Sequence, residues 1–167
     1  RSFGEVALEG DLDDTRSGGV SPWQAIRLEA NGRRVQLPPE ARLDLGGIGK
    51  GWAADRAAAR LNTLGPSLVE AGGDIAISGP RRGGRGWRII VADPQRPDLD
   101  LAHLSVSVGG VATSGTDYRR WRRGGEWQHH LIDPRTARPA DTDVQSATVI
   151  APSLVLAEIA SKTVLLL

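Results

Sequence analysis

Short stretches in which apolar and polar side chains alternate recur along this chain, and turn-forming residues separate one stretch from the next. Because neighbouring side chains of a strand point to opposite faces, such alternation predicts strands with one buried face. Strands are expected on this basis at residues 5–8, 25–30, 33–37, 67–69, 75–77, 87–91, 104–108, 127–132 and 147–150. Asn31-Gly32 separates two of these stretches, and this dipeptide predicts a tight β-hairpin.

Two longer stretches predict helices. An Ala-rich run from about residue 50 to residue 64 follows a glycine-rich turn and ends at Gly65-Pro66. A second helix is expected from Ser153, which suits an N-cap, to Leu167. Strands in series with singly placed helices are typical of one α+β domain. Residues 1–22 are rich in Gly, Asp and Ser without a sustained period, and predict an irregular segment before a domain at residues 23–167.

Composition excludes several kinds of site. The 167 residues carry a net charge of +1, which argues against nucleic-acid binding driven by electrostatics alone. Without cysteine, the chain has no disulfide, no thiolate zinc site and no cysteine nucleophile. Without methionine, Arg1 is not an initiator end, so a preceding segment is expected, and any signal or membrane anchor would have to lie there.

Three short stretches of small residues, each next to an expected strand, point to a ligand site. They are residues 44–51, 71–74 and 112–115. Glycine lets a backbone approach a ligand closely, and the N–H groups at the start of a helix favour a phosphate. Thr113 and Ser114 would donate hydroxyl hydrogen bonds to phosphate oxygens. Tight sheet corners without a ligand are the alternative interpretation, and the residues alone leave both open.

In their order and approximate spacing these stretches resemble the ApbE family of FAD:protein FMN transferases. The motifs that carry the resemblance are the glycine turn before Lys50, Gly72-Gly73-Asp74, Ala112-Thr113-Ser114-Gly115, His129-His130-Leu131-Ile132-Asp133-Pro134 and Ala157-Glu158-Ile159-Ala160-Ser161-Lys162. The resemblance implies one α+β domain with a mostly antiparallel sheet and a few packed helices, as the C-terminal part of a longer protein. It also implies binding of FAD and Mg²⁺, and transfer of FMN to a Thr or Ser hydroxyl of an acceptor flavoprotein.

The resemblance also implies roles for single residues. The expected FAD contacts are Asp44, Lys50 and, through its backbone, Ile132. The expected magnesium ligands are the carbonyl of Gly47 and the side chains at Glu158, Ser161 and Lys162. The attacking hydroxyl has a high pKa and needs a positioned base, for which His130 is the first candidate and Asp133 the second.

Two positions depart from the family pattern. Lys162 stands where the family usually has Thr, and a protonated lysine has no lone pair with which to ligate magnesium. Its ammonium would occupy part of the metal site, pair with Glu158 one helical turn earlier, or contact the pyrophosphate, and these three alternatives stay open. Ala137 stands where the family usually has Gly, so the turn after Asp133 is expected to differ.

Two other functions compete with flavin transfer. A non-catalytic FAD-binding module is favoured by Lys162, and an FAD pyrophosphatase would use the same site with water as the acceptor. Extracytoplasmic or membrane-anchored location is common in the family, and cytoplasmic location is the alternative.

Several other polar residues have structural interpretations. His129 should face away from His130 on the expected strand, which argues against a shared zinc site. The basic stretch at residues 119–123 is interpreted as a solvated ribbon or a docking surface for the acceptor protein, and not as a nucleic-acid site. Asp74 would either assist the metal site or cap its own turn.

Overall fold

The computed structural model describes residues 23–167, apart from residues 30, 40, 42 and 118. The irregular segment and the short strand expected within residues 1–22 therefore lie outside the described residues. In chain order, the elements are η1 (Trp23–Ala25), β1 (Arg27–Leu28), β2 (Val35–Gln36), α1 (Gly49–Leu61), β3 (Leu68–Ala71), β4 (Asp74–Ile77), β5 (Trp87–Ala92), β6 (Asp100–Val106), β7 (Gly109–Gly115), β8 (Arg120–Arg123), β9 (Glu126–His129), β10 (Ile132–Asp133), β11 (Arg138–Pro139), β12 (Ser146–Ala151) and α2 (Leu154–Leu166).

A four-stranded sheet in the order β12-β7-β4-β3 forms the centre of the fold, and each of its three strand pairs is antiparallel. The pairs β1–β2, β5–β6, β8–β9 and β10–β11 are antiparallel as well, as two-stranded ribbons. The predicted α+β class with a mostly antiparallel sheet is therefore confirmed. Gly72 and Gly73, with φ of 62° and 90°, form the tight turn between β3 and β4 as expected.

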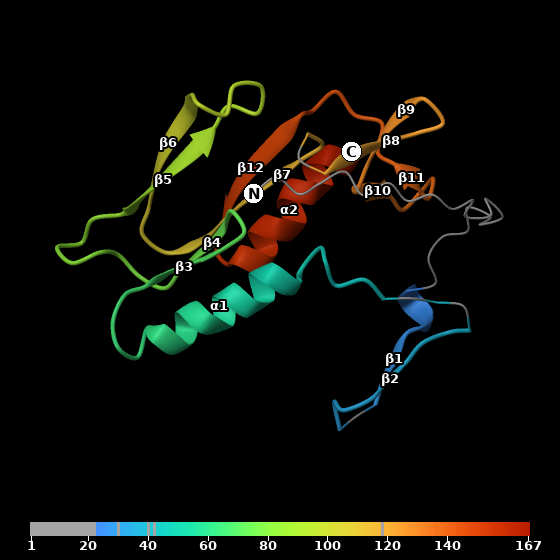
Figure 1. Ribbon diagram of the computed structural model, residues 1–167. Coiled ribbons are helices and arrows are strands. Elements are labelled where there is room, and N and C mark those ends of the chain that lie inside the picture. The colour runs from blue at the N-terminus through green and yellow to red at the C-terminus, as the bar shows by residue number, and fades with distance from the viewer. Residues whose placement is uncertain (1–22, 30, 40, 42, 118) are drawn as a thin grey trace.

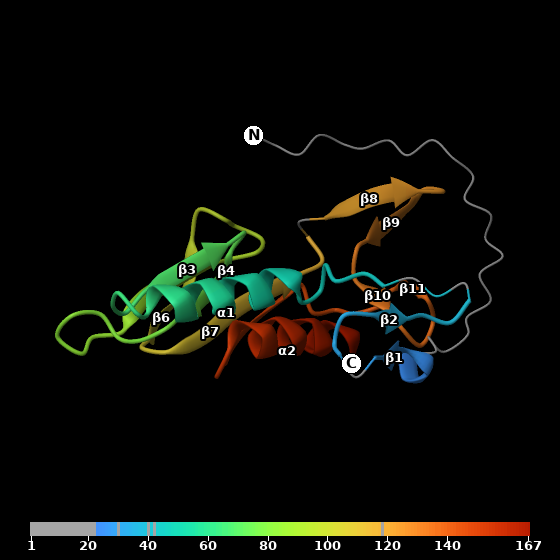
Figure 2. The same ribbon diagram turned by 90° about the horizontal axis from the view of Figure 1, so that it is seen from below.

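The central sheet is covered on both faces (Figures 1 and 2). On one face, Ala76 of β4 and Ala112 of β7 pack against Ala54, Ala58, Leu154 and Ala157 of the two helices, which lie side by side. On the other face, Ile77 and Val111 pack against Ile89 and Val106 of the β5–β6 ribbon. Neighbouring residues of β4 and β7 thus face opposite layers, with alanine on the face that lies against the helices. No helix of the described residues is long and apolar enough to cross a bilayer.

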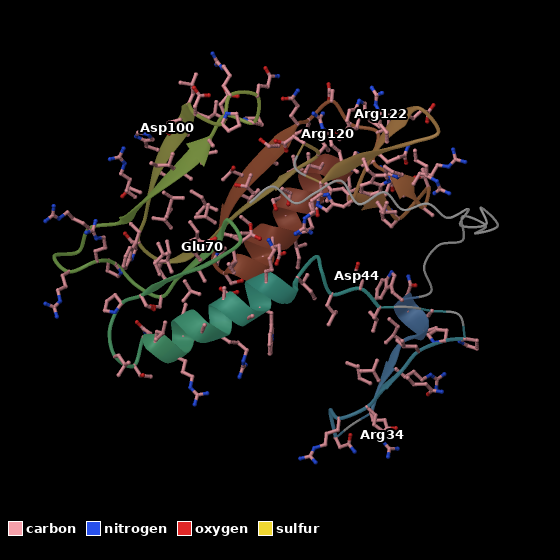
Figure 3. All side chains as sticks on the ribbon, viewed as in Figure 1. Arg34, Asp44, Glu70, Asp100, Arg120 and Arg122 are labelled. Atoms are coloured by element: carbon pink, nitrogen blue, oxygen red, sulfur yellow. The ribbon has the colours of Figure 1, made fainter. Side chains whose placement is uncertain are left out.

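The remaining ribbons lie outside this three-layer body. The β8–β9 and β10–β11 ribbons lie at one end, near the C-terminus of α2, and the β1–β2 hairpin stands apart from the sheet (Figure 1). The Asn31-Gly32 hairpin expected from the sequence is confirmed, with φ of 65° at Gly32. On β8, the guanidinium groups of Arg120 and Arg122 lie 4.7 and 5.0 Å from the ring centre of Trp127 on β9. Both arginines are exposed, and Figure 3 shows them extending from this ribbon.

Three sequence predictions about local structure are wrong. Residues 112–115 do not form a turn but the second half of β7, because the turn falls earlier, where Gly109 has a φ of 112°. The stretch 127–132 is not one strand, since β9 ends at His129 and β10 begins at Ile132. The basic stretch, interpreted as a solvated ribbon, contains the exposed strand β8, for which no secondary structure was predicted. The first helix also ends at Leu61, three residues before the expected end.

The turn between β10 and β11 places Ala137 at a φ of 56°, the left-handed region that favours glycine. We expect Ala137→Gly to stabilise the fold by up to about 1 kcal/mol, because it relieves the Cβ–carbonyl crowding. As a matched control, Ala53→Gly on the exposed side of α1 should destabilise the fold by about 1 kcal/mol. Urea denaturation of both variants would check this, and equal losses of stability would contradict the strain at Ala137.

Candidate functional site

The glycine turn before α1 supplies no side-chain cap for the first turn of that helix. Ile48 occupies the N-cap and has no side-chain acceptor, so it cannot satisfy the N–H groups that begin the helix. One of these groups, the N–H of Gly51, donates a 2.9 Å hydrogen bond to Glu158 Oε2 on α2. A Cβ at Gly51 would stand 2.7 Å from that same oxygen. Glycine at this position therefore permits the two helices to meet at the candidate site.

Glu158 and Lys162 form a pair on α2 beside this turn. Glu158 is fully buried, and Lys162 Nζ donates to its Oε1 at 3.1 Å and to its main-chain carbonyl at 3.3 Å. The stem of Lys162 lies against the glycine turn, since a Cβ at Gly47 would be 3.7 Å from its Cε. The Ser161 hydroxyl donates to the Glu158 carbonyl at 3.1 Å and lies 2.8 Å from the Ser114 hydroxyl of β7. The four residues matched to magnesium ligands therefore lie together.

A second ion pair flanks the same turn. Lys50 Nζ lies 2.5 Å from Oδ2 of Asp74, whose side chain is 4% exposed, whereas that of Lys50 is 43% exposed. Oδ1 of Asp74 accepts a hydrogen bond from the backbone N–H of Thr113 at 3.3 Å. The hydrogen bonds of Asp74 recorded in the described part of the chain thus go to Lys50 and Thr113, and they fix a partly exposed lysine at the start of α1. The ammonium of Lys50 and the N–H groups of the helix N-terminus therefore lie at the same corner.

The hydroxyl groups expected to contact phosphate are engaged within the fold. Thr113 Oγ1 lies 2.8 Å from Thr148 Oγ1 on the neighbouring strand β12, at an exposed position. Ser114, in contrast, is buried, with its hydroxyl on Ser161. Phosphate contacts by these two side chains stay predictions.

The two neighbouring histidines differ in their environment. His129 is fixed as its Nε2–H tautomer, because Nε2 donates to the Ala140 carbonyl at 3.0 Å and Nδ1 accepts from the N–H of Leu131 at 3.3 Å. Partial desolvation of the imidazole lowers the pKa of His130 below its usual 6.5 against the opposing effect of a hydrogen bond to the Arg119 backbone, and the positive charges of Arg119 and Lys162 lower it further. His130 is therefore a neutral base at neutral pH, within the electrostatic reach of the Glu158–Lys162 pair.

Asp133, the second candidate base, has a structural role instead. Its carboxylate is bound by both Nε and Nη2 of Arg135, at 3.0 and 2.9 Å from its nearest oxygens. This charged hydrogen bond lowers the pKa of Asp133. Arg135 Nη2 also donates to the Leu166 carbonyl at 2.6 Å, which fastens the β10–β11 ribbon to the end of α2. A carboxylate held in this way is a weak base, which leaves His130 as the candidate.

Asp44 and Ile132 lie at the margin of the site. Asp44 projects from the segment that leads from β2 to α1, as Figure 3 shows, and its Oδ1 accepts a hydrogen bond from the Gly46 N–H at 2.7 Å. Ile132 lies on β10, paired with Pro139, and is 48% exposed. Their FAD contacts stay predictions, since the hydrogen bonds of Asp44 recorded in the described part of the chain remain inside its own turn.

Asp55 was missed by the sequence analysis. From α1 it accepts hydrogen bonds from the N–H groups of Leu154 at 2.9 Å and Val155 at 3.0 Å, and so caps α2 from outside that helix. Ser153, the N-cap expected from the sequence, accepts from the Leu156 N–H at 3.3 Å. A lone acidic residue in an Ala-rich helix was the available signal. Asp55 thus fixes the start of α2 and, with it, the position of Glu158 one turn later.

The residues present do not fit a resident magnesium ion. Mg²⁺ takes six oxygen ligands in near-octahedral geometry, several of them usually water, and the protein normally supplies one or two carboxylates. Both oxygens of Glu158 already accept hydrogen bonds, and the group at position 162 is a cation. Among the described residues, no three His, Cys, Asp or Glu side chains stand together in a way that could hold a metal, and every buried side-chain nitrogen or oxygen has a hydrogen-bond partner.

Comparison with known proteins defines the class. The sequence profile of the ApbE family matches residues 9–167. The chain therefore belongs to the ApbE family. It is 37% identical over 158 residues to the FAD:protein FMN transferase of Vibrio cholerae, covering 92% of this chain and 46% of that protein. The crystal structure of the ApbE protein of Thermotoga maritima matches with a TM-score of 0.78 and 34% identity, over 86% of this chain and 47% of that one.

The solved flavin transferase ApbE of Vibrio cholerae gives a TM-score of 0.68 at 32% identity, over 86% of this chain and 46% of that chain. The chain thus spans less than half the length of the relatives it matches.

Proposed function

We propose that this chain contributes the helix-lined half of a flavin transferase site, which transfers FMN from FAD to a Thr or Ser hydroxyl of an acceptor flavoprotein. The observation that carries the proposal is the convergence of two lysines at one helix start. Two lysines flank the glycine turn at the start of α1. Lys50 is paired with Asp74, and Lys162 is paired with Glu158. Such a corner suits the pyrophosphate of a dinucleotide. The names of the relatives support flavin as the group transferred.

In the proposed reaction, the acceptor oxygen attacks the phosphorus on the flavin side of the pyrophosphate. A phosphate ester forms, the P–O–P bond breaks and AMP leaves, while the hydroxyl proton passes to the neutral imidazole of His130. The negative charge that develops on the phosphates needs a fixed positive charge nearby. Lys50 and Lys162 supply that charge from this chain.

The test is incubation of the full-length protein that contains this chain with FAD and a Thr-containing acceptor. Covalent flavin on the acceptor, detected by in-gel fluorescence and mass spectrometry, is the expected result. Free FMN and AMP without a labelled acceptor would identify the pyrophosphatase alternative. Unchanged FAD with a measurable binding constant would identify a binding module. The hydrogen bond between Lys162 and Glu158 favours this alternative, because it engages both side chains with each other.

The lowered pKa of His130 gives a pH prediction. Because desolvation disfavours the imidazolium, His130 stays neutral to lower pH than an ordinary histidine and retains its ability to accept the proton. We therefore expect the acid limb of the kcat/KM–pH profile, which reports the free enzyme, to lie below pH 6.5, the usual value. In His130→Asn this limb should disappear, whereas His103→Asn, which removes an exposed histidine paired with Asp100 on β6, should leave it unchanged. An acid limb that persists in His130→Asn would assign the base to another group.

A further inference from the structure

Glu158 is a buried carboxylate, each of whose two oxygens accepts a hydrogen bond from within the chain. Its side chain is 1% exposed, with the Gly51 N–H on Oε2 and the Lys162 ammonium on Oε1. A carboxylate that ligates a cation must turn at least one oxygen toward that cation. In this chain both oxygens face other groups, so Glu158 serves as the counter-ion of Lys162.

The Lys162 ammonium occupies the space in which the implied ligands would hold a metal. It hydrogen-bonds to Glu158 twice, its stem passes Gly47, and its charge acts on the pKa of His130. The neighbouring Ser161 hydroxyl is taken by Ser114 and by the Glu158 carbonyl. A divalent ion placed among these groups would meet an ammonium at close range in a poorly hydrated site, where the repulsion between like charges is weakly screened.

We propose that the Lys162 ammonium, held in place by Glu158, replaces a resident divalent cation in this chain, so that the site between α1 and α2 binds no Mg²⁺. The binding part of this inference stands without the proposed function. Its chemical consequence, that Lys162 supplies the fixed positive charge beside the pyrophosphate, rests on the proposed function. The Lys162 side chain is 24% exposed, so its charge is accessible to a ligand that enters over the glycine turn.

Mn²⁺, which takes the same oxygen ligands as Mg²⁺ and is detected by EPR, tests the binding part on the full-length protein. Wild type should show no saturable site that depends on Glu158. Lys162→Thr, which replaces the ammonium by a hydroxyl oxygen, should bind one Mn²⁺ per chain at least about tenfold more tightly than wild type. Lys162→Met removes the charge without offering an oxygen and should gain less, and adding Glu158→Gln to Lys162→Thr should abolish the gain.

One Mn²⁺ bound by wild type and lost in Glu158→Gln would overturn the proposal, and this measurement holds even if Lys162→Thr does not fold. Equal Mn²⁺ binding by wild type and a folded Lys162→Thr would overturn it as well. Turnover in EDTA tests the chemical part, since wild type should keep its rate and Lys162→Thr should lose it. A wild-type rate abolished by EDTA would contradict the replacement, whereas absence of transfer in every condition would refute the proposed function and leave the Mn²⁺ result standing.

Discussion

Gly110→Ala is expected to destabilise the fold by about 3 kcal/mol and to lower its Tm by about 10 °C. A Cβ at this position of β7 would stand 2.2 Å from Leu154 Cα and 2.3 Å from its nitrogen, at the first turn of α2. These atoms are backbone, so no rotamer change can make room for the methyl group. β7 cannot retreat either, because Gly110 is paired with Ala76 on one side and with Ala151 on the other.

Thermal unfolding followed by circular dichroism checks this prediction, with Gly49→Ala as the matched control. Gly49 begins α1 and has open space where its Cβ would go, so the same added methyl should stabilise the helix by up to about 1 kcal/mol. The two variants should therefore shift Tm in opposite directions. An unchanged Tm in Gly110→Ala would mean that α2 does not lie directly on β7.

The parts of the fold that depend on local chemistry were predictable from the sequence. The Asn31-Gly32 hairpin, the Gly72-Gly73 turn and the Ser153 cap each require particular residues within a few positions, and the structure has all three. The turn expected at residues 112–115 failed for a local reason too. Small residues are compatible with a turn, but they are equally compatible with a strand on which a helix packs closely, and β7 is such a strand.

The ion pairs and hydrogen bonds of the site were only partly predictable from the sequence. Glu158 and Lys162 are one helical turn apart, so their contact follows from helix geometry alone. Lys50 and Asp74 are 24 residues apart, and Gly51 and Glu158 are 107 apart. No periodicity links residues at such separations, because their contact depends on how the two helices pack on the sheet. The order of motifs shared with the ApbE family indicated that these residues belong to one site, but it did not indicate which of their atoms are in contact.

Some polar residues have hydrogen bonds that all serve the fold, and of these only His129 was interpreted as structural from the sequence. Asp55, Asp133 and His129 each stand beside a motif or in a helix, and each has a chemistry that suits a site. The structure uses them to cap α2, to hold Arg135 and to join the Ala140 and Leu131 backbones. Whether a polar side chain is free for a ligand depends on partners that are distant in the sequence, so residue type alone could not separate Asp133 from His130.

Lys50→Met is expected to reduce kcat/KM for FAD by about 10²–10³-fold, the usual cost of removing one group that stabilises developing charge. Lys50 is the second residue of α1, and Asp74 fixes its ammonium at one place while leaving 43% of the side chain exposed. A charge fixed beforehand costs no reorganisation during the reaction, so its loss should lower kcat more than it raises KM. Steady-state kinetics with a Thr-containing acceptor would separate the two effects.

Lys50→Met also leaves the buried Asp74 carboxylate without its partner. Removing one member of a buried ion pair destabilises a fold, and this loss of stability is the main confounding effect. Adding Asp74→Asn to Lys50→Met removes the stranded charge while Asn Oδ1 keeps the bond from the Thr113 N–H. We expect this double variant to recover stability but not rate. Arg60→Met, with the same change in net charge at the far end of α1, should leave kcat/KM unchanged. Recovery of the rate in the double variant would show that Lys50 acts only by neutralising Asp74, and the positive corner at the start of α1 would then have no part in the chemistry.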